Sequence, residues 1–279
     1  MTSNKCTVMT IHETSEVPLE PINGKPTLVY WDIVGLAHPL RMALALSGVE
    51  WNDVRLVCGT SPTDTTTNKK AWYPAKQMLR DKNILEFPNL PYYMEDYGGG
   101  YAHDKVRLVQ SDAILGYLGH KYNLMGKTIS PQVPEHLFDM LLEEARDLDS
   151  TLIRLSYEEG AEAVAKWLSH DQELREKLNV WENYIHHKTD GPFVLGTHLT
   201  IVDLKLYTFL YKFQHAQAEL MVSSMSGVIP EKDVPSLPFW VPAYLEDVKT
   251  ATPELEAYLN SPDSMQTPIN NPHARFDNL

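Results

Sequence analysis

The strand-forming pattern of this chain stops near its middle. Between residues 26 and 122, short runs of β-branched and aromatic residues alternate with segments of helical spacing, whereas beyond residue 134 only helical spacing continues. Strand patterns repeat every second residue and helix patterns every three to four residues, so the change marks a change of architecture. The sequence therefore predicts an α/β domain followed by an all-helical domain.

Composition predicts where these domains begin and end. Residues 1–25 are polar and contain two prolines, so they are predicted to be a flexible N-terminal extension. The α/β domain is predicted at residues 26–122 and a linker at residues 123–134. Helical spacing places the second domain at residues 135–260, and the segment 261–279, rich in Pro and Asn, is predicted to be a C-terminal tail.

The predicted elements of the first domain follow a β-α-β order and then a hairpin and a helix. This order suits a small mixed sheet with helices on its faces. The strand-like runs are 27–31, 52–57, 90–94 and 106–109, the helices begin near Pro39 and Gln110, and the connections include a loop at 59–68 and a hairpin tip at Gly98–Gly100. In the second domain, Thr200 and Asp203 have the spacing of a helix capping box.

Bulk properties exclude several classes of function. The net charge of −13 argues against a nucleic-acid partner, since phosphate binding needs a basic face. No run approaches the ~20 apolar residues of a membrane helix, and the first residues lack the pattern of a signal peptide. Two cysteines, Cys6 and Cys58, are too few for a disulfide framework, so a cytoplasmic location is expected. The adjacent His186 and His187 face different sides of a helix, and no metal site is expected.

Tyr30 is a candidate for activating a thiol. It ends the first strand of the α/β domain, shortly before Gly35 interrupts the pattern, so its hydroxyl could point into a cleft. The thiolate is the reactive form of a thiol, and a charge-assisted hydrogen bond of roughly 1.5–3 kcal/mol is enough to lower a thiol pKa by one to two units. Taken alone, however, a tyrosine at this position is more often a packed strand residue.

A proline at the start of a strand makes Asn89-Leu90-Pro91 a candidate backbone site. Proline is awkward there unless its peptide bond is cis or its missing N–H is not needed. A cis bond would turn the Leu90 backbone outward, where it could pair with an extended peptide ligand. A plain proline turn is an equally good interpretation from these residues alone.

Two further pairs of residues could hold carboxylates. Gln110-Ser111 opens a helix directly after a strand, and a helix N-terminus attracts anions, although serine there is often only a cap. Trp72 and Lys76 are four residues apart, so one helical turn presents an indole N–H and an ammonium on one side. The alternative is a packed tryptophan beside a solvated lysine. With Tyr30 and Leu90, these pairs supply what a thiol peptide with two carboxylates, γ-Glu-Cys-Gly, would need.

Three stretches, Tyr30 to Arg41, Phe87 to Tyr92 and Gln110 to Ile114, closely resemble the motifs of glutathione transferases of the mu class. The resemblance extends over roughly residues 26–250. It implies a thioredoxin-like N-terminal domain, an all-α C-terminal domain, a homodimer, and glutathione as co-substrate with no tightly bound cofactor.

The resemblance also implies roles for individual residues. Tyr30 would stabilise the thiolate, and Tyr157 would lie over the electrophile and assist as a proton donor. Asp147 would reach the glutathione bound to the partner subunit, and Phe87 would be the key that inserts into that subunit. The glutathione site would be lined by Tyr30, Trp31, Leu36, Trp72, Lys76, Asn89, Leu90, Pro91, Gln110, Ser111 and Asp147, and the electrophile site by Ile33, Val34, Leu36, Arg146, Ile153 and Tyr157.

The chain departs from the family pattern at several positions. Val34 stands where the family usually has arginine, and Arg146 replaces an apolar residue, which could favour polar or anionic electrophiles. Three functions remain open: a transferase for soft electrophiles, a glutathione-dependent isomerase or synthase with one endogenous substrate, and a non-catalytic carrier or structural relative. Retention of Tyr30 argues against the third, and turnover separates the first two.

Overall fold

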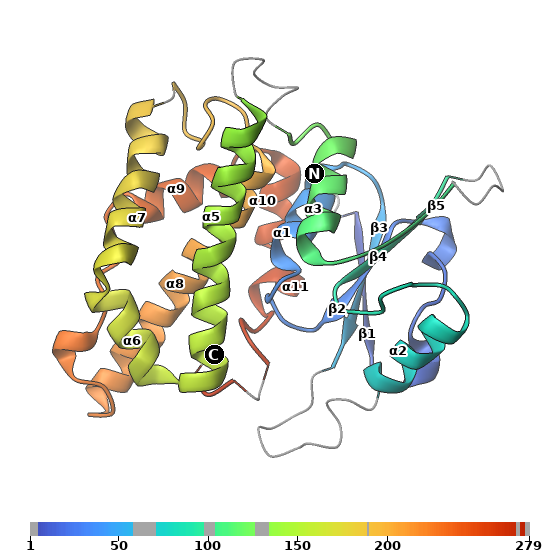
Figure 1. Cartoon of the computed structure of the whole chain (residues 1–279), viewed down its shortest axis with the longest axis horizontal. Helices are drawn as coiled ribbons and strands as arrows, with labels where there is room; N and C mark the ends of the chain where they lie inside the picture. The colour runs from blue at the N-terminus through green and yellow to red at the C-terminus, as the bar shows by residue number, and fades with distance from the viewer. Residues whose placement is uncertain are drawn as a thin grey trace. The chain divides into compact units, whose positions relative to one another are not determined.

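The computed structural model describes residues 5–57, 71–97, 104–125, 134–188, 190–271 and 274–276. The chain divides into two compact units, Met1–Tyr122 with Pro253–His273, and Asn123–Thr252 with Ala274–Leu279. We call them the sheet unit and the helical unit (Figure 1). The predicted loop at 59–68, the hairpin tip at Gly98–Gly100 and most of the predicted linker lie outside the described residues.

Within the described residues, the strands of the sheet unit form one five-stranded mixed sheet in the order β1-β3-β2-β4-β5. The first three pair in parallel, and β4 and β5 run antiparallel to their neighbours. Helices α1 and α3 pack together on one face, and α2 lies on the other (Figure 1). The elements are β1 (Cys6–Ile11), β2 (Thr27–Trp31), α1 (His38–Leu46), β3 (Trp51–Leu56), α2 (Trp72–Asp81), β4 (Tyr92–Asp96), β5 (Lys105–Val109) and α3 (Ser111–Lys121), with single 3-10 turns at Thr14–Glu16 and Ile22–Gly24.

The prediction of a flexible extension at residues 1–25 is wrong. Residues Cys6–Ile11 form an edge strand that pairs with β3 along its whole length, from Cys6 opposite Trp51 to Ile11 opposite Leu56. Every residue of β3 is buried, so an unpaired outer edge would leave its backbone groups without partners away from water. The N-terminal strand supplies those partners.

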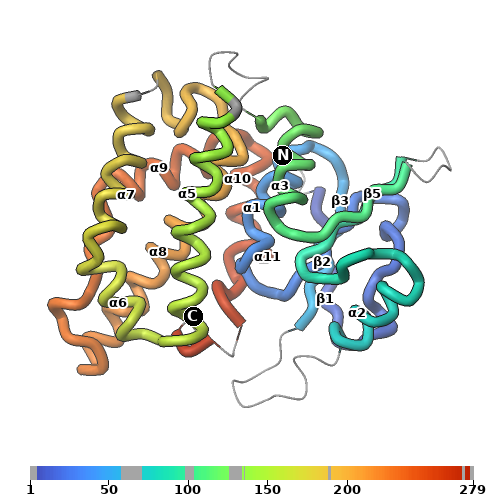
Figure 2. The backbone as a smooth tube through the Cα atoms, viewed as in Figure 1, coloured from blue at the N-terminus to red at the C-terminus, as the bar shows by residue number. Residues whose placement is uncertain are grey.

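The predicted C-terminal boundary at residue 260 is also wrong. Helices α10 (Pro253–Leu259) and α11 (Pro262–Met265) belong to the sheet unit, where α10 packs against α1 (Figure 2). The Tyr258 ring lies 6.4 Å from the Trp51 ring between centroids. The predicted tail is packed rather than free, because Thr267, Ile269 and Asn270 are buried. Its first part, up to His273, belongs to the sheet unit, whereas the part from Ala274 onward belongs to the helical unit.

The helical unit is built around α8, most of whose residues are buried and which packs closely against α5. The predicted capping box is confirmed: Thr200 is the N-cap of α8 and Asp203 is its reciprocal partner. The helices of this unit are α5 (Glu135–Arg154), α6 (Ala161–His170), α7 (Gln172–Asn183), α8 (Ile201–Met225) and α9 (Val241–Lys249), with π-helical turns at Leu155–Glu159 and Tyr184–Lys188 and a 3-10 turn at Glu231–Asp233. None of the described helices combines the length and the apolar character needed to span a membrane.

Candidate functional site

The loop that follows β2 encloses the hydroxyl of Tyr30. The Tyr30 side chain is 6% exposed, and the backbone N–H of Leu36 donates a hydrogen bond to its oxygen at 3.2 Å. Gly35 has a φ of +41°, and a Cβ at this residue would lie 2.7 Å from the ring and 2.8 Å from the hydroxyl oxygen. Glycine is therefore needed both for the turn and for the close approach of the loop to the phenol.

A buried arginine holds this loop from behind. Arg41 of α1 donates to the backbone carbonyls of Ile33 at 2.6 Å and Trp31 at 3.2 Å. Its Nε donates to both carboxylate oxygens of Asp53 on β3, at 3.0 and 3.1 Å, and both side chains are almost fully buried. Charge-assisted hydrogen bonds of this kind hold their partners in a defined geometry. Trp31 and Ile33 are thus fixed on either side of Asp32.

A second feature of the sheet unit is the strained backbone before α3. Gln110 is the N-cap of α3 and has a φ of +72° and a ψ of 117°, which is rare for any residue other than glycine. Its side chain is exposed, and Ser111 is the first helical residue rather than the cap. A residue held in such a conformation suggests a functional constraint. The N-terminus of an 11-residue helix also favours an anion.

The other predicted residues of the sheet unit lie on α2 and just before β4. Trp72 begins α2 and stacks on Tyr92 with the ring centroids 6.2 Å apart, whereas Lys76 is half-buried one turn later. The Leu90–Pro91 peptide bond is cis, which is one of the two conformations that the sequence left open. Leu90 is buried and Asn89 is exposed.

The remaining predicted residues lie on or just after α5 in the helical unit. Arg146 pairs with Glu143 and, at 3.5 Å, with Asp147, so two carboxylates already share its charge. This weakens the expectation that Arg146 selects anionic electrophiles. Ile153 is half-buried on the same helix, and Tyr157 lies half-buried in the π-helical turn that follows.

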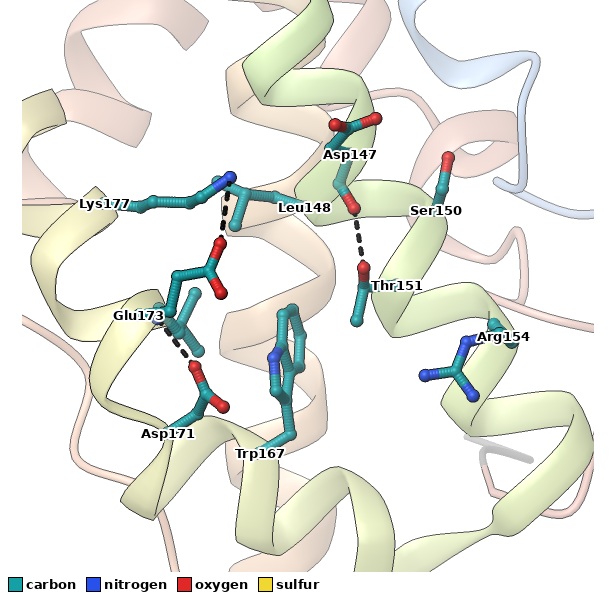
Figure 3. Close-up of a pocket in the computed structure, with 10 residues that line it drawn as sticks. Asp147, Leu148, Ser150, Thr151, Arg154, Trp167, Asp171, Glu173 and Lys177 are labelled. Atoms are coloured by element: carbon teal, nitrogen blue, oxygen red, sulfur yellow. Dashed lines mark hydrogen bonds and ion pairs between the residues drawn. The ribbon is translucent and has the colours of Figure 1, made fainter.

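A polar cavity of about 410 Å³ opens beside Asp147 (Figure 3). In the close-up, Asp147 lies on α5 and Lys177 on the neighbouring α7, and Trp167 lies between these two helices. The Asp147 backbone carbonyl accepts a hydrogen bond from Thr151 at 2.8 Å, and its carboxylate is 61% exposed. The lining residues are Asp147, Leu148, Ser150, Thr151, Arg154, Trp167, Asp171, Glu173, Leu174 and Lys177.

A more apolar cavity of about 380 Å³ lies farther along α5 and α7. Met140, Val180, Trp181 and Tyr184 supply its apolar lining, and Glu144, Glu173, Glu176 and Lys177 stand among the other residues around it. Met140 and Val180 are about half exposed. In the sheet unit, the predicted key Phe87 is 73% exposed.

The described part of the chain also bears on metal binding and on cysteine reactivity. No group of three or more His, Cys, Asp and Glu side chains there is arranged to hold a metal ion. Burial raises the pKa of the Cys6 thiol, and the nearby Asp53 carboxylate adds to this effect. Cys6 is therefore held in its less reactive thiol form. Cys58 is outside the described residues.

Sequence reasoning missed the charged residues that support the Tyr30 loop. Asp53 and Arg55 are two residues apart, so in a strand their side chains lie on the same face of the sheet. From the sequence, that face could equally well be exposed to solvent. The structure instead buries both and pairs them with each other at 2.7 Å. Only the structure shows that every position of β3 is buried, and charges inside such a strand must be paired.

Comparisons with known proteins show which family this chain is similar to. A family model described as "Glutathione S-transferase, C-terminal domain" matches residues 146–262. A glutathione S-transferase from Tyrophagus putrescentiae is 34% identical over 192 residues, covering 68% of this chain and 76% of the relative. Glutathione S-transferase Mu 5 from Homo sapiens is 32% identical over 187 residues, covering 66% and 74%. Among solved structures, the Pi-class glutathione S-transferase of Onchocerca volvulus matches with a TM-score of 0.60 at 21% identity, covering 90% of this chain and 99% of the other.

Proposed function

Because this chain belongs to the glutathione S-transferase family and resembles its mu class, we propose that it transfers the glutathione thiolate to small electrophiles with Tyr30 as the catalytic residue. The observation that carries the proposal is the hydrogen bond from the Leu36 N–H to the Tyr30 oxygen. An N–H donated to a phenol oxygen polarises its O–H bond and makes that hydroxyl a stronger donor to an anion. A sulfur anion is what the reaction requires.

Glutathione would be held at both ends and along its backbone. The exposed Gln110, Ser111 and the N-terminus of α3 suit one carboxylate, and Trp72 with Lys76 suits the other. The Leu90 backbone would pair with the cysteinyl residue of the peptide. Trp31, Leu36, Asn89, Pro91 and Asp147 complete the proposed glutathione site.

The electrophile is proposed to contact the apolar residues of the Tyr30 loop. Ile33 and Val34 are buried and Leu36 is half-buried, so this loop offers an apolar wall. Tyr157 is proposed to donate a proton to electrophiles whose leaving atom gains charge, and Arg146 and Ile153 are proposed to contact the electrophile.

The proposed function is tested by conjugation of glutathione to an activated aryl chloride. The thiolate sulfur forms a bond to the ring carbon and chloride leaves, so product and chloride should appear in equal amounts. Calorimetry with glutathione alone provides the binding control. Binding without turnover of aryl halides, enones or epoxides would favour the isomerase or carrier alternatives and contradict the proposal.

We further propose a cytoplasmic homodimer in which Phe87 enters the apolar cavity of the partner copy. Replacing Phe87 by serine removes an apolar anchor of roughly 1.5–3 kcal/mol from each of two equivalent contacts. The dimer dissociation constant should therefore rise by about two to four orders of magnitude, as measured by sedimentation. Phe239→Ser is the matched control, since Phe239 is 85% exposed but lies outside the cavity lining. Equal dissociation of both variants, or of neither, would contradict the role of Phe87.

Asp147 is proposed to act on glutathione bound to the partner subunit. Its exposed carboxylate should contribute roughly 0.5–1 kcal/mol, so Asp147→Asn should weaken glutathione binding about two- to fivefold with no change in the free energy of unfolding. The effect should disappear in a monomeric Phe87→Ser background, because no partner site is then present. Asp139→Asn, at an exposed position on the same helix, is the control. An Asp147 effect that persists in the monomer would show that the contact is made within one subunit.

A further inference from the structure

The C-terminal segment is bonded to the Tyr30 loop. We call residues 262–270, which comprise α11 and the chain after it, the strap. The backbone N–H of Val34 donates to the Pro268 carbonyl at 2.7 Å, and the N–H of Gly35 donates to the Ile269 carbonyl at 3.2 Å. The next residue of the loop, Leu36, donates to the Tyr30 oxygen. Three consecutive N–H groups of this loop thus donate hydrogen bonds, two of them to the strap and the third to the phenol oxygen.

Arg55 anchors the strap to the sheet. It lies on β3 directly opposite Tyr30 in the parallel register, and its side chain is 5% exposed. Its Nη1 donates to the Asp263 carbonyl and to the Thr267 Oγ1, both at 2.8 Å, and reaches the Asp32 carboxylate at 3.3 Å. Arg55 therefore touches the strap at two points and the beginning of the Tyr30 loop at a third.

The Arg55 side chain is itself held in place by other buried side chains. The Arg55 Nε donates to Asp53 at 2.7 Å, and Asp53 is held in turn by Arg41, which binds the carbonyls of Trp31 and Ile33. The planar guanidinium has donors in a fixed fork, so one side chain can bind the sheet, the loop and the strap in a single geometry. Burial strengthens these hydrogen bonds because no water competes for the donors.

We propose that Arg55 is a positioning residue for the transferase reaction: it holds the strap, and the strap holds the Val34–Leu36 backbone in the geometry that aims the Tyr30 hydroxyl at the glutathione sulfur. The inference rests on the proposed role of Tyr30. Arg55 itself touches neither substrate nor sulfur in this proposal. Its loss should weaken thiol activation and leave the residues that bind the glutathione carboxylates in place.

Thr267→Val provides the gentlest test, because valine keeps the shape of threonine and removes one acceptor of Arg55. Arg55→Gln removes the guanidinium that binds the strap. Arg55→Lys keeps the positive charge but lacks the forked arrangement of donors. The ultraviolet absorbance of the bound thiolate, titrated against pH, should show the thiol pKa rising by about one unit in Arg55→Gln. Thr267→Val and Arg55→Lys should give smaller rises, and the dissociation constant of glutathione should change less than threefold in every variant.

Arg107→Gln separates positioning from a general loss of stability. Arg107 on β5 is also largely buried and pairs with Asp96 at 2.7 Å and with Glu20, but it does not contact the strap. Its replacement should lower the melting temperature and leave the bound thiol pKa unchanged. If Thr267→Val and Arg55→Gln also leave that pKa unchanged while Tyr30→Phe raises it, the positioning role is overturned and the role of Tyr30 stands. If Tyr30→Phe itself has no effect on that pKa, the result contradicts the proposed catalytic role of Tyr30, on which the role of Arg55 rests.

Discussion

Replacing Tyr30 by phenylalanine is expected to lower kcat/KM at neutral pH by about ten- to a hundredfold. The phenol is proposed to give the thiolate a charge-assisted hydrogen bond of roughly 1.5–3 kcal/mol, and each 1.4 kcal/mol corresponds to one pKa unit of the thiol. Phenylalanine preserves the ring that packs against Gly35. Glutathione affinity should therefore change little, because the groups proposed to hold its carboxylates are untouched.

The dependence of kcat/KM on pH should show whether the ionisation of the bound thiol has changed. With glutathione saturating, the acid limb of kcat/KM for the electrophile reports the pKa of the bound thiol in the wild type. In Tyr30→Phe this pKa should move toward ~8.5, the value of a free thiol. The variant should regain much of its activity at high pH, where the thiol ionises without help. Wild-type turnover and an unchanged acid limb in Tyr30→Phe would remove Tyr30 from the mechanism.

Tyr92→Phe is the matched control for this experiment. Tyr92 lies on the neighbouring strand β4, is fully buried, and donates its hydroxyl hydrogen bond to the Pro18 carbonyl at 2.8 Å. Its replacement also removes one buried hydroxyl from the sheet unit. It should cost about 1 kcal/mol of stability and leave the acid limb of kcat/KM in place.

Asp203→Ala is expected to be the most destabilising single change in the helical unit, at about 3–5 kcal/mol. The Asp203 carboxylate is fully buried at the start of α8 and accepts four hydrogen bonds. They come from the Val194 N–H, the Thr200 N–H and hydroxyl, and the Tyr244 hydroxyl, at 2.8 to 3.0 Å. Alanine would leave all of these donors without partners away from water, and it would remove one half of the capping box.

Chemical denaturation of Asp203→Ala, followed by far-ultraviolet circular dichroism, measures this loss. Asp247→Ala is the control, since Asp247 is exposed on α9 and its replacement should change the free energy of unfolding by less than about 0.5 kcal/mol. Because α8 forms the centre of its unit, the loss should appear as a lower midpoint for the whole helical unit. A loss below 1 kcal/mol would mean that the four donors find other partners when the carboxylate is removed.

Local sequence patterns predicted much of the candidate site. Tyr30 lies at the end region of a strand before a glycine turn and Gln110 precedes a helix, as the sequence indicated, and Leu90 precedes a proline whose cis bond is one of the two conformations left open. Each of these features depends on residues within a few positions of one another. The capping box at Thr200 and Asp203 was predictable for the same reason.

Features that join distant parts of the chain were not predictable from such patterns. Residues 6–11 form a strand because β3 has a free, buried edge, and residues 262–270 are ordered because Arg55 and the Tyr30 loop offer donors to their carbonyls. Residues 262–270 look polar and irregular when taken alone, whereas residues 6–11 carry a short strand-like run that the polar residues around it obscure. Their order comes from partners more than 40 residues away in the first case and more than 200 in the second.

The sequence by itself determined the two-part architecture, the positions of most strands and helices, and the residues that could bind and activate a thiol peptide, because periodicity, capping and turn chemistry act over short distances. Only the tertiary structure decided how the Tyr30 loop is held. Arg41, Asp53 and Arg55 read as ordinary helix and strand residues in one dimension. Folding buries them together, and a buried charge must find partners wherever the chain can supply them.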